Sequence, residues 1–376
     1  MAVRGVSLSE SANSKSTRSR YWPEPDVSRL IKWPSTRDVG KVGVLVVNLG
    51  TPDEPTAPAI RRYLRQFLSD PRVIEIPKLL WWPILNGPIL LARPRKLVHR
   101  YAAIWMEHGS PLLVYTQRQA EGLANALRER GHTVEVEVGM RYGNPSLESA
   151  LRTLREKRCE HILTVALYPQ YAASTTGTVV DEVARLTARM RNQPELRFIK
   201  RFHDFGPYID AVASKIEGVW QQKGRPDRLV MSFHGLPKRC ADLGDPYCKD
   251  SYGTARALAR RLGLDDDQYL VTFQSRFGPA QWLQPYTEPT LVSLAQSGVK
   301  KVDVVCPGFL ADCLETLEEI SIECRDAFIG AGGEQFRYIP CLNDDAQWVD
   351  GLTDLVLAHM QGWSTRSDAE TATPEI

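Results

Sequence analysis

From residue 42 onward, the chain alternates between short apolar runs rich in β-branched residues and longer segments whose apolar positions recur with helical spacing. The apolar runs have the length and composition of buried strands. They are Val42–Leu49, Thr133–Met140, His161–Tyr168, Leu196–Phe202, Arg228–His234, Tyr269–Gln274, Lys301–Cys306 and Gln335–Ile339. Helices are predicted near 59–68, 249–262, 287–297, 313–329 and 344–361. Strands that alternate with helices indicate βαβ units, so the pattern predicts parallel sheets covered by helices on both faces.

The predicted strands divide into two sets of four, which predicts an α/β protein with two similar domains. Each domain is expected to be Rossmann-like, a parallel sheet of about four strands flanked by helices, with the active-site cleft between the two domains. We place the first domain at 41–205 and the second at 206–343, because a Gly-Pro break falls within 203–207. A C-terminal helix is expected at 344–362.

The two ends of the chain differ in composition from the rest. Residues 1–20 hold six serines, three arginines and a lysine but only one acid, Glu10. Such a stretch cannot bury enough apolar surface to offset its ordering entropy. Residues 1–40 are therefore predicted to be a disordered tail, and 363–376 a flexible one.

Composition narrows the class of protein. The chain has 376 residues, of which 43% are hydrophobic and 24% charged, as is typical of soluble globular proteins. Its 47 basic and 45 acidic residues leave a net charge of +2, too balanced for a nucleic-acid surface. No apolar run is long enough to span a membrane. Seven scattered cysteines without a CxxC pair indicate reduced thiols, so we expect a cytoplasmic protein.

Ligands of open α/β sheets bind beyond the carboxyl ends of the strands, so the segments after the predicted strands are the candidate site. These segments are Gly50-Thr51-Pro52, Arg141-Tyr142, Pro169-Gln170-Tyr171 with Ser174-Thr175-Thr176-Gly177, His234-Gly235-Leu236-Pro237, Ser275-Arg276-Phe277 and Pro307-Gly308-Phe309. No GxGxxG or P-loop follows a strand, which argues against a dinucleotide or nucleotide enzyme. The Ser174–Gly177 segment fits either an anion-binding helix start or simple N-capping.

His234 is the candidate base, because it closes a predicted strand and is followed by a bend at Gly235 and Pro237. Imidazole exchanges protons near neutral pH and binds metals, although a single histidine also fits a purely structural role. Trp282, Phe309 and Tyr142 would supply aromatic walls beside it.

The predicted helix 313–329 carries an acidic stripe made of Glu315, Glu318, Glu319 and Glu323. Helical stepping places these acids on one side. The stripe fits a solvated face, but its lack of basic partners one turn away and its position after a strand also fit a site for a divalent metal.

An apolar segment at 76–96, the lip, contains Trp81 and Trp82 and is interrupted by prolines. It fits either buried core or an exposed surface for a flat apolar ligand or a membrane. Arg93, Arg95 and Lys96 at its end are candidate partners for carboxylates or anionic lipid headgroups.

The motifs together resemble the ferrochelatase family, whose members insert ferrous iron into a porphyrin. The resemblance extends in order from about residue 42 to about residue 361. The matching strings are Val46–Pro52, Phe67–Val73, Tyr168–Tyr171 with Ser174–Gly177, Ser232–Pro237, Gln274–Pro279, and Cys306–Phe309 with Asp312, Glu315 and Glu319.

The resemblance implies two chelatase domains and a set of functional residues. His234 and Glu315 correspond to the residues assigned to iron binding or pyrrole deprotonation, and Asp312 and Glu319 to outer acids on the metal path. The resemblance also implies a π-bulge in the acidic helix. Residues expected to bind substrate are Arg141, Tyr142, Trp282, Phe309, Ser174, Thr175, Arg93 and Arg95.

The expected reaction is insertion of Fe²⁺ into protoporphyrin IX with release of two protons. An animal-type histidine is replaced by Cys313, so no ligand role is carried over there. A [2Fe–2S] cluster is not expected, because Ala173 replaces one ligand cysteine and no cysteine follows Cys341. A chelatase for coproporphyrin or for cobalt or nickel, and a non-catalytic tetrapyrrole carrier, remain alternatives.

The expected partners are the porphyrin and ferrous iron, with no nucleic acid. The protein is expected to be a monomer or weak dimer that contacts anionic membranes peripherally through the Trp81-Trp82 lip.

Overall fold

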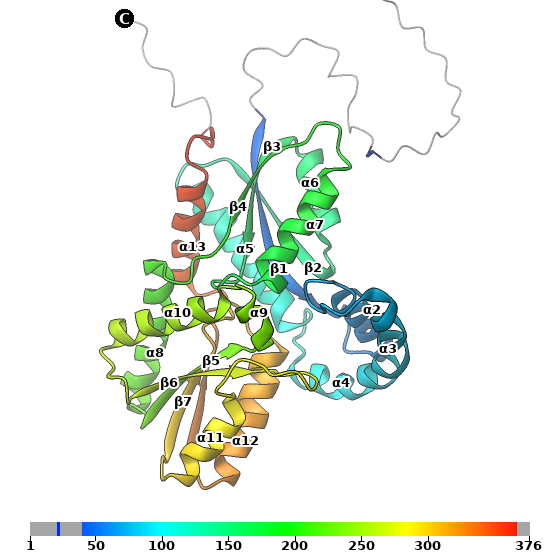
Figure 1. Ribbon diagram of the computed structural model, residues 1–376. Helices are drawn as coiled ribbons and strands as arrows, with labels where there is room; N and C mark the ends of the chain where they lie inside the picture. The colour runs from blue at the N-terminus through cyan, green and yellow to red at the C-terminus, as the bar shows by residue number, and fades with distance from the viewer. Residues whose placement is uncertain (1–20, 23–39, 367–376) are drawn as a thin grey trace, which may run out of the picture.

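Two four-stranded parallel sheets form the framework of the protein. The computed structural model describes residues 21–22 and 40–366. Sheet 1 has the order β2-β1-β3-β4 and sheet 2 the order β6-β5-β7-β8, and Figure 1 shows one above the other. The strands are β1 (Lys41–Thr51), β2 (Val134–Gly143), β3 (Cys159–Ala166), β4 (Glu195–Ile199), β5 (Arg228–His234), β6 (Tyr269–Gln274), β7 (Lys301–Val305) and β8 (Gln335–Ile339). The predicted fold class and all eight strands are confirmed.

Helices cover both sheets and form a lobe beside them. The α-helices are α2 (Ala57–Leu68), α3 (Lys78–Ile84), α4 (Leu90–Ile104), α5 (Pro111–Glu129), α6 (Leu147–Glu156), α7 (Thr178–Thr187), α8 (Gly206–Lys223), α9 (Lys238–Asp242), α10 (Tyr247–Leu262), α11 (Thr287–Gln296), α12 (Arg325–Gly330) and α13 (Ala346–His359). The π-helices are η1 (Leu85–Ile89), η2 (Ala173–Gly177) and η3 (Glu315–Cys324). The helix predicted at 313–329 is therefore η3 followed by α12, as the family resemblance implied and helical periodicity alone did not.

Strand β1 shows why these runs become buried strands. Val42, Val44 and Val46 face the core cluster that includes Leu123 of α5, while alternate residues such as Leu45 face the cluster beneath α6 and α7. Both faces of a parallel strand are covered, so a continuous apolar run is needed rather than an alternating one. The same need accounts for the β-branched runs elsewhere in the chain.

Helix α13 connects the two halves. Its Trp348 is fully buried and packs against Phe202 and Tyr208, with ring centroids 5.9 Å apart in each pair. The indole Nε1 donates to Gln119 Oε1 of α5 at 3.2 Å. The hydroxyl of Tyr208 on α8 in turn donates to the carbonyl oxygen of Pro307, which follows β7. These contacts fix the carboxyl ends of the sheets relative to each other.

Most of the predicted tails, 1–20, 23–39 and 367–376, lies outside the described residues. The parts that are described correct the prediction. Trp22 is buried on sheet 1, where its backbone N–H donates to Arg189 and the guanidinium of Arg152 lies 4.1 Å from its ring. At the other end, Trp363 packs against Arg197 and His161. A single tryptophan supplies enough apolar contact to hold each segment, although the surrounding composition is polar.

The strand order places the expected site. In each sheet the order reverses once, between β1 and β3 in sheet 1 and between β5 and β7 in sheet 2. Ligands of doubly wound proteins bind outside the carboxyl ends of the strands at such a switch point. In sheet 2 the flanking residues are His234 and the segment that contains Phe309.

We expect Trp348→Ala to lower the free energy of unfolding by about 3–5 kcal/mol, because a large buried side chain leaves a cavity between α13 and the two sheets. Equilibrium denaturation followed by circular dichroism measures it. Trp82→Ala is the matched control: Trp82 is exposed, and its loss is expected to change stability by no more than about 0.5 kcal/mol. Equal effects of the two substitutions would contradict the role given to Trp348.

Candidate active site

His234 ends β5 and presents one free ring nitrogen. Its Nδ1 lies 2.7 Å from the carbonyl oxygen of Gly235, which can only accept a hydrogen bond. Nδ1 therefore carries the proton and Nε2 has the lone pair. No hydrogen bond to Nε2 occurs among the described residues, and the side chain is half-buried. The imidazole is thus set to accept a proton or to contact a metal.

Two aromatic side chains stand beside His234, as predicted. The ring of Phe309 lies 6.4 Å from the imidazole, centroid to centroid. Trp282 lies against the backbone after β5: a Cβ on Gly235 would come within 3.1 Å of the indole and 2.7 Å of the Gln274 carbonyl oxygen. A residue with a Cβ would collide with the carbonyl oxygen and crowd the indole. Only glycine at position 235 therefore allows the indole of Trp282 to pack against the backbone next to His234.

The start of η3 is tied to the end of β5 through Gln274. The buried amide of Gln274 accepts from Ser232 Oγ at 2.7 Å and donates to the carbonyl oxygen of Glu315 at 2.7 Å. Ser232 is two residues before His234 on the same strand. The two hydrogen bonds therefore hold Glu315, the predicted partner of His234, at the switch point of sheet 2.

Glu319 lies four residues after Glu315 on η3. Ser275 holds its carboxylate, because the Ser275 backbone N–H donates to Oε1 at 2.7 Å and its hydroxyl donates to Oε2. Ser275 has a φ of 63°, a strained value for a residue with a side chain. Burial raises the pKa of Glu319, and the charge of Glu315 raises it further, against the opposing effects of Ser275 and His234. Glu319 is therefore a carboxylate able to take up a proton close to His234.

The acidic stripe has no basic partner one turn away on its own helix, as the sequence indicated, but it has one from elsewhere in the chain. Arg100 of α4 contacts Glu323 at 2.6 Å and Glu318 at 3.1 Å. Arg100 is distant from η3 along the chain. The absence of a lysine or arginine one turn away on the helix therefore did not reveal these ion pairs.

Asp312 does not face this site. It is buried, and its carboxylate accepts hydrogen bonds from Asn343 at 2.7 Å, from the hydroxyls of Thr316 and Tyr338, and from the backbone of Cys341. Its oxygens already accept hydrogen bonds from these groups, so its role as a metal ligand stays a prediction that this geometry does not support. In the described part of the chain, no three His, Cys, Asp or Glu side chains are grouped closely enough to hold a metal ion. The predicted set His234, Glu315, Glu319 and Asp312 is therefore not assembled as a chelating site.

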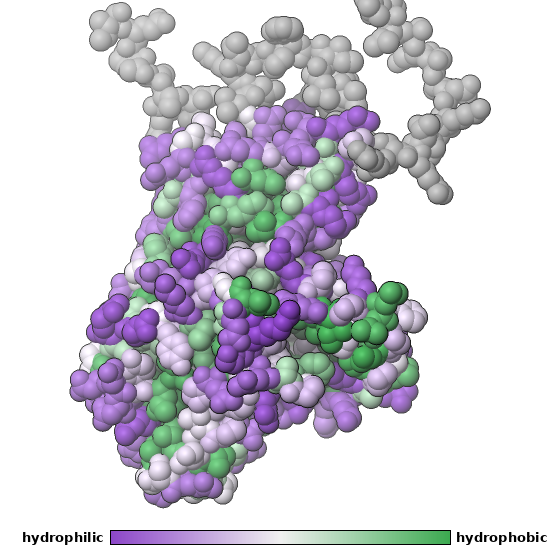
Figure 2. Space-filling model, in the orientation of Figure 1, coloured by the Kyte–Doolittle hydropathy of each residue, from purple (hydrophilic) through white to green (hydrophobic). Residues whose placement is uncertain are grey.

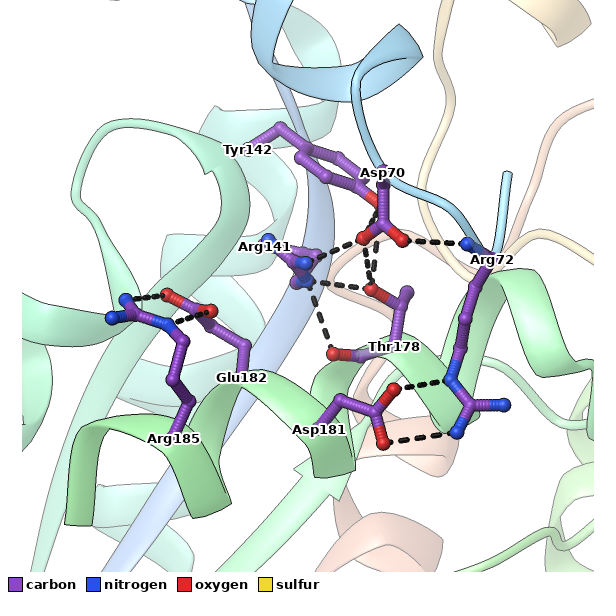
Figure 3. Close-up of polar contacts among 8 residues, drawn as sticks. All are labelled: Asp70, Arg72, Arg141, Tyr142, Thr178, Asp181, Glu182 and Arg185. Carbon is purple, nitrogen blue, oxygen red and sulfur yellow. Dashed lines mark hydrogen bonds and ion pairs between the residues drawn. The ribbon is translucent and has the colours of Figure 1, made fainter. Parts of the chain in front are cut away.

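At the end of β2, Arg141 and Tyr142 converge on Asp70, as Figure 3 shows. The Asp70 carboxylate pairs with Arg141 and accepts from Tyr142 Oη at 2.9 Å, from Thr178 Oγ1, and from the backbone N–H of Arg72 at 2.8 Å. Burial acts to raise the pKa of Asp70, but the hydrogen bonds from Thr178, Arg72 and Tyr142 outweigh it and leave the pKa below its ordinary value.

This network changes the role expected for Tyr142. The side chain has no exposed surface, so it lies behind the site rather than on its wall. The N-cap of η2 is Ala172 and not Thr175 or Thr176; Thr175 Oγ1 accepts from the backbone N–H of Ala172 and donates to its carbonyl oxygen, while Ser174 is half-buried beside it. Near Arg141, the buried hydroxyl of Tyr168 has no hydrogen-bond partner among the described residues.

Tyr63 connects the two parts of the site. Burial raises the pKa of this tyrosine, and the neighbouring groups that raise it further include Tyr101, Glu315, Tyr168 and Tyr142. Tyr63 on α2 thus lies within electrostatic range both of the acidic helix η3 and of the end of sheet 1.

The lip divides into a buried and an exposed half. Trp81 is buried and donates through Nε1 to the carbonyl oxygen of Leu68 at 2.7 Å, which corrects its prediction as a surface residue, whereas Trp82 is 68% exposed. The Arg93 guanidinium lies 4.3 Å from the ring of Phe277 in the loop after β6, and Arg95 is exposed. The lip therefore reaches sheet 2 next to the candidate site.

The fold defines the class of protein first. SirB of Bacillus subtilis, solved with Fe³⁺, has a similar fold, with a TM-score of 0.51 and 14% identity over 85% of this chain and 95% of that one. The ferrochelatase family model matches residues 41–360. A ferrochelatase of Bordetella pertussis is 63% identical over 347 residues, covering 92% of this chain and 96% of its own. One of Aromatoleum aromaticum is 54% identical over 346 residues, covering 92% and 93%. The chain belongs to the ferrochelatase family, which confirms the resemblance.

Several residues of the site were not identified from the sequence. Asp70 lies within a matching string, but nothing in its spacing shows that it receives four hydrogen bonds. Tyr63 and Tyr101 occupy positions typical of a helix core. Ser275 and Arg100 act through contacts that only the fold brings together.

We expect Asp70→Asn to lower the free energy of unfolding at pH 7 by about 3–5 kcal/mol, because it leaves Arg141 nearly buried without its charge partner. Since the folded pKa of Asp70 is below the ordinary value of 3.8, its contribution is present above that pH and is lost as the pH falls below it. Urea unfolding at pH 7 and pH 3 should therefore show a difference that shrinks in acid. Asp181→Asn, which breaks the more exposed pair with Arg72, is the control and should cost no more than about 1 kcal/mol. A pH-independent difference for Asp70→Asn would refute the assignment.

Proposed function

We propose that the protein inserts Fe²⁺ into protoporphyrin IX to give haem, with release of two protons. The observation that carries the proposal is the free Nε2 of His234 at the switch point of sheet 2. Gln274 ties η3 to this point through the carbonyl oxygen of Glu315, and the Glu319 carboxylate is near enough to His234 for their charges to interact. Membership of the ferrochelatase family supports the same reaction.

The pyrrole protons must leave as the metal enters. His234 takes a proton at Nε2, because Nδ1 is held in its protonated form by Gly235. Glu315 and Glu319 balance the resulting positive charge, and the raised pKa of Glu319 lets it accept a proton in turn. The two carboxylates and the imidazole offer the incoming Fe²⁺ few ligands, which keeps the substrate metal transferable.

The remaining predicted residues would hold the porphyrin. Phe309 and Trp282 offer flat apolar surfaces beside His234, against which a macrocycle could be bent to expose its nitrogen lone pairs. Arg141, fixed by Asp70 next to the free Tyr168 hydroxyl, would face it from sheet 1. Arg93, Arg95 and the Ser174-Thr175 segment would meet its carboxylates.

The family supports iron over a cobalt or nickel chelatase, and the acidic row on η3 argues against a carrier, which needs no base. We keep 41–205 and 206–343 as the proposed domains, with α13 packed on α5 and α8 of both. We propose a monomer or weak dimer.

We propose further that the lip binds peripherally to the surface of anionic membranes. The exposed apolar side chains are Ile76, Leu79, Leu80, Trp82, Ile84 and Leu91, and Figure 2 shows them as a green patch on the α2–α4 lobe. Lys78, Arg95 and Lys96 border the patch and are exposed. No helix among the described residues is long and apolar enough to cross a membrane. Such a patch with basic flanks favours reversible surface binding.

His234→Ala should fold normally and lose at least about 100-fold in turnover, because the general base disappears without disturbing the core. Circular dichroism and anaerobic assays with protoporphyrin IX and Fe²⁺ measure both properties. His203→Ala, a histidine of the β4–α8 connection outside the site, is the control variant and should keep its activity. Turnover of His234→Ala above a tenth of the wild-type value would remove His234 from the mechanism.

Sedimentation with vesicles of anionic lipid should carry down the wild-type protein at low salt and release it at high salt, since screening removes the contribution of the basic flank. A double variant, Leu79→Glu with Trp82→Glu, should stay in the supernatant while its turnover of soluble porphyrin is kept. Neutral vesicles are the control. Equal sedimentation of the variant and the wild-type protein would contradict docking through the lip.

A further inference from the structure

One arginine joins the lip to the acidic helix. Arg100 extends from α4 toward η3, where Nη2 lies 2.6 Å from Glu323 Oε1 and Nη1 lies 3.1 Å from Glu318 Oε2 and 3.3 Å from Glu323 Oε2. The guanidinium therefore pairs with Glu323 through both terminal nitrogens, which is the bidentate form, and shares one of these nitrogens with Glu318. The Arg100 side chain is 44% exposed, against 11% for Glu318.

The π-helix makes this shared contact possible. Glu318 and Glu323 are five residues apart, and in an α-helix they would point about 140° away from each other. A π-helix pairs each residue with the one five positions on, so the two carboxylates lie on the same side of η3. A single cation can then contact both. The contact of Arg100 with both acids therefore depends on the π-helical geometry of η3.

These two acids are the outer end of a row that leads to His234. Burial and the charges of Glu323 and Glu319 raise the pKa of Glu318, while Arg100 lowers it. The charge of Glu315 raises the pKa of Glu319, and the charge of His234 lowers it. Neighbouring members of the row are therefore close enough to influence one another, from the half-exposed Glu323 inward to the base.

We propose that Arg100 is a positioning residue that sets how strongly this acidic row attracts a divalent metal ion, by neutralising Glu318 and Glu323 at its outer end. The proposal rests on the proposed metal insertion. A metal ion that reaches Glu318 and Glu323 must displace the guanidinium or accept fewer oxygens. Arg100 thereby keeps the metal from being held at the outer end, where no porphyrin nitrogen can receive it.

The alternative is that Arg100 only fastens the lip. In that case its removal would loosen α4, whose Arg93 packs on Phe277, and would weaken porphyrin binding instead. The two roles differ in which Michaelis constant changes. Arg100→Gln removes the charge and keeps a hydrogen-bonding side chain of similar length, while Arg100→Lys keeps the charge.

Steady-state kinetics with Zn²⁺ and with Fe²⁺, at saturating porphyrin, test the proposal. Arg100→Gln should lower the apparent KM for the metal about two- to five-fold, the range expected for a partly exposed ion pair. The change should shrink at high ionic strength, and Arg100→Lys should resemble the wild-type protein. Arg130→Gln is the matched control, because Arg130 also bridges two carboxylates, Asp350 and Asp354 of α13, far along α5 from the site. It should leave the metal KM unchanged.

A binding measurement separates this proposal from the proposed function. Mn²⁺ titration followed by electron paramagnetic resonance should show tighter binding to Arg100→Gln than to the wild-type protein, and Glu323→Gln in the same chain should reverse the gain. This readout holds even if no metalloporphyrin is formed, an outcome that would count against metal insertion alone. An unchanged Mn²⁺ affinity, or a raised KM for porphyrin with an unchanged KM for metal, would overturn the role given to Arg100.

Discussion

The geometry of the site depends on the buried amide of Gln274. It accepts from Ser232 on β5 and donates to the first carbonyl of η3, so it fixes the acidic helix relative to the strand that ends in His234. The bond to Ser232 is buried and the bond to Glu315 is partly buried. Leaving a buried partner without its hydrogen bond would cost about 1–3 kcal/mol. An amide is needed here, because the side chain must accept at one end and donate at the other.

Once Gln274 has placed η3, the structure must tolerate several carboxylates close together. Like charges in a partly buried site repel, and each acid here is offset by a different group. Ser275 donates twice to Glu319, Arg100 bridges Glu318 and Glu323, and His234 lies near the inner end. The strained φ of Ser275 belongs to this arrangement, since it directs both its N–H and its hydroxyl at the same carboxylate.

The sequence predicted what local pattern controls and missed what distant contacts decide. The eight strands followed from β-branched runs, because burial on both faces of a parallel sheet demands them. Trp81 and Trp82 could not be separated, since neighbours on a helix point in different directions and only packing shows which one meets Leu68. Asp312 was assigned to the metal path by the family resemblance alone, and its hydrogen bonds with Tyr338 and Asn343 could not be foreseen because these partners lie far along the chain. Arg100 pairs with an acid 218 residues away, beyond the reach of any helical spacing rule.

The two sheets have the same strand order, but the groups at the ends of their strands differ. They differ in how many of their hydrogen-bonding positions are already occupied. At the end of β2, Asp70 receives donors from Arg141, Tyr142, Thr178 and Arg72, so this network is rigid and has no capacity left for chemistry. At the end of β5, by contrast, His234 keeps a free Nε2. On the side of sheet 1, the buried hydroxyl of Tyr168, near Arg141, lacks a partner among the described residues. Unpaired buried groups reduce stability, and a folded protein tolerates them where a ligand completes them. We therefore expect the Asp70 network to supply a wall that stays in place, and His234 to supply the atom that reacts.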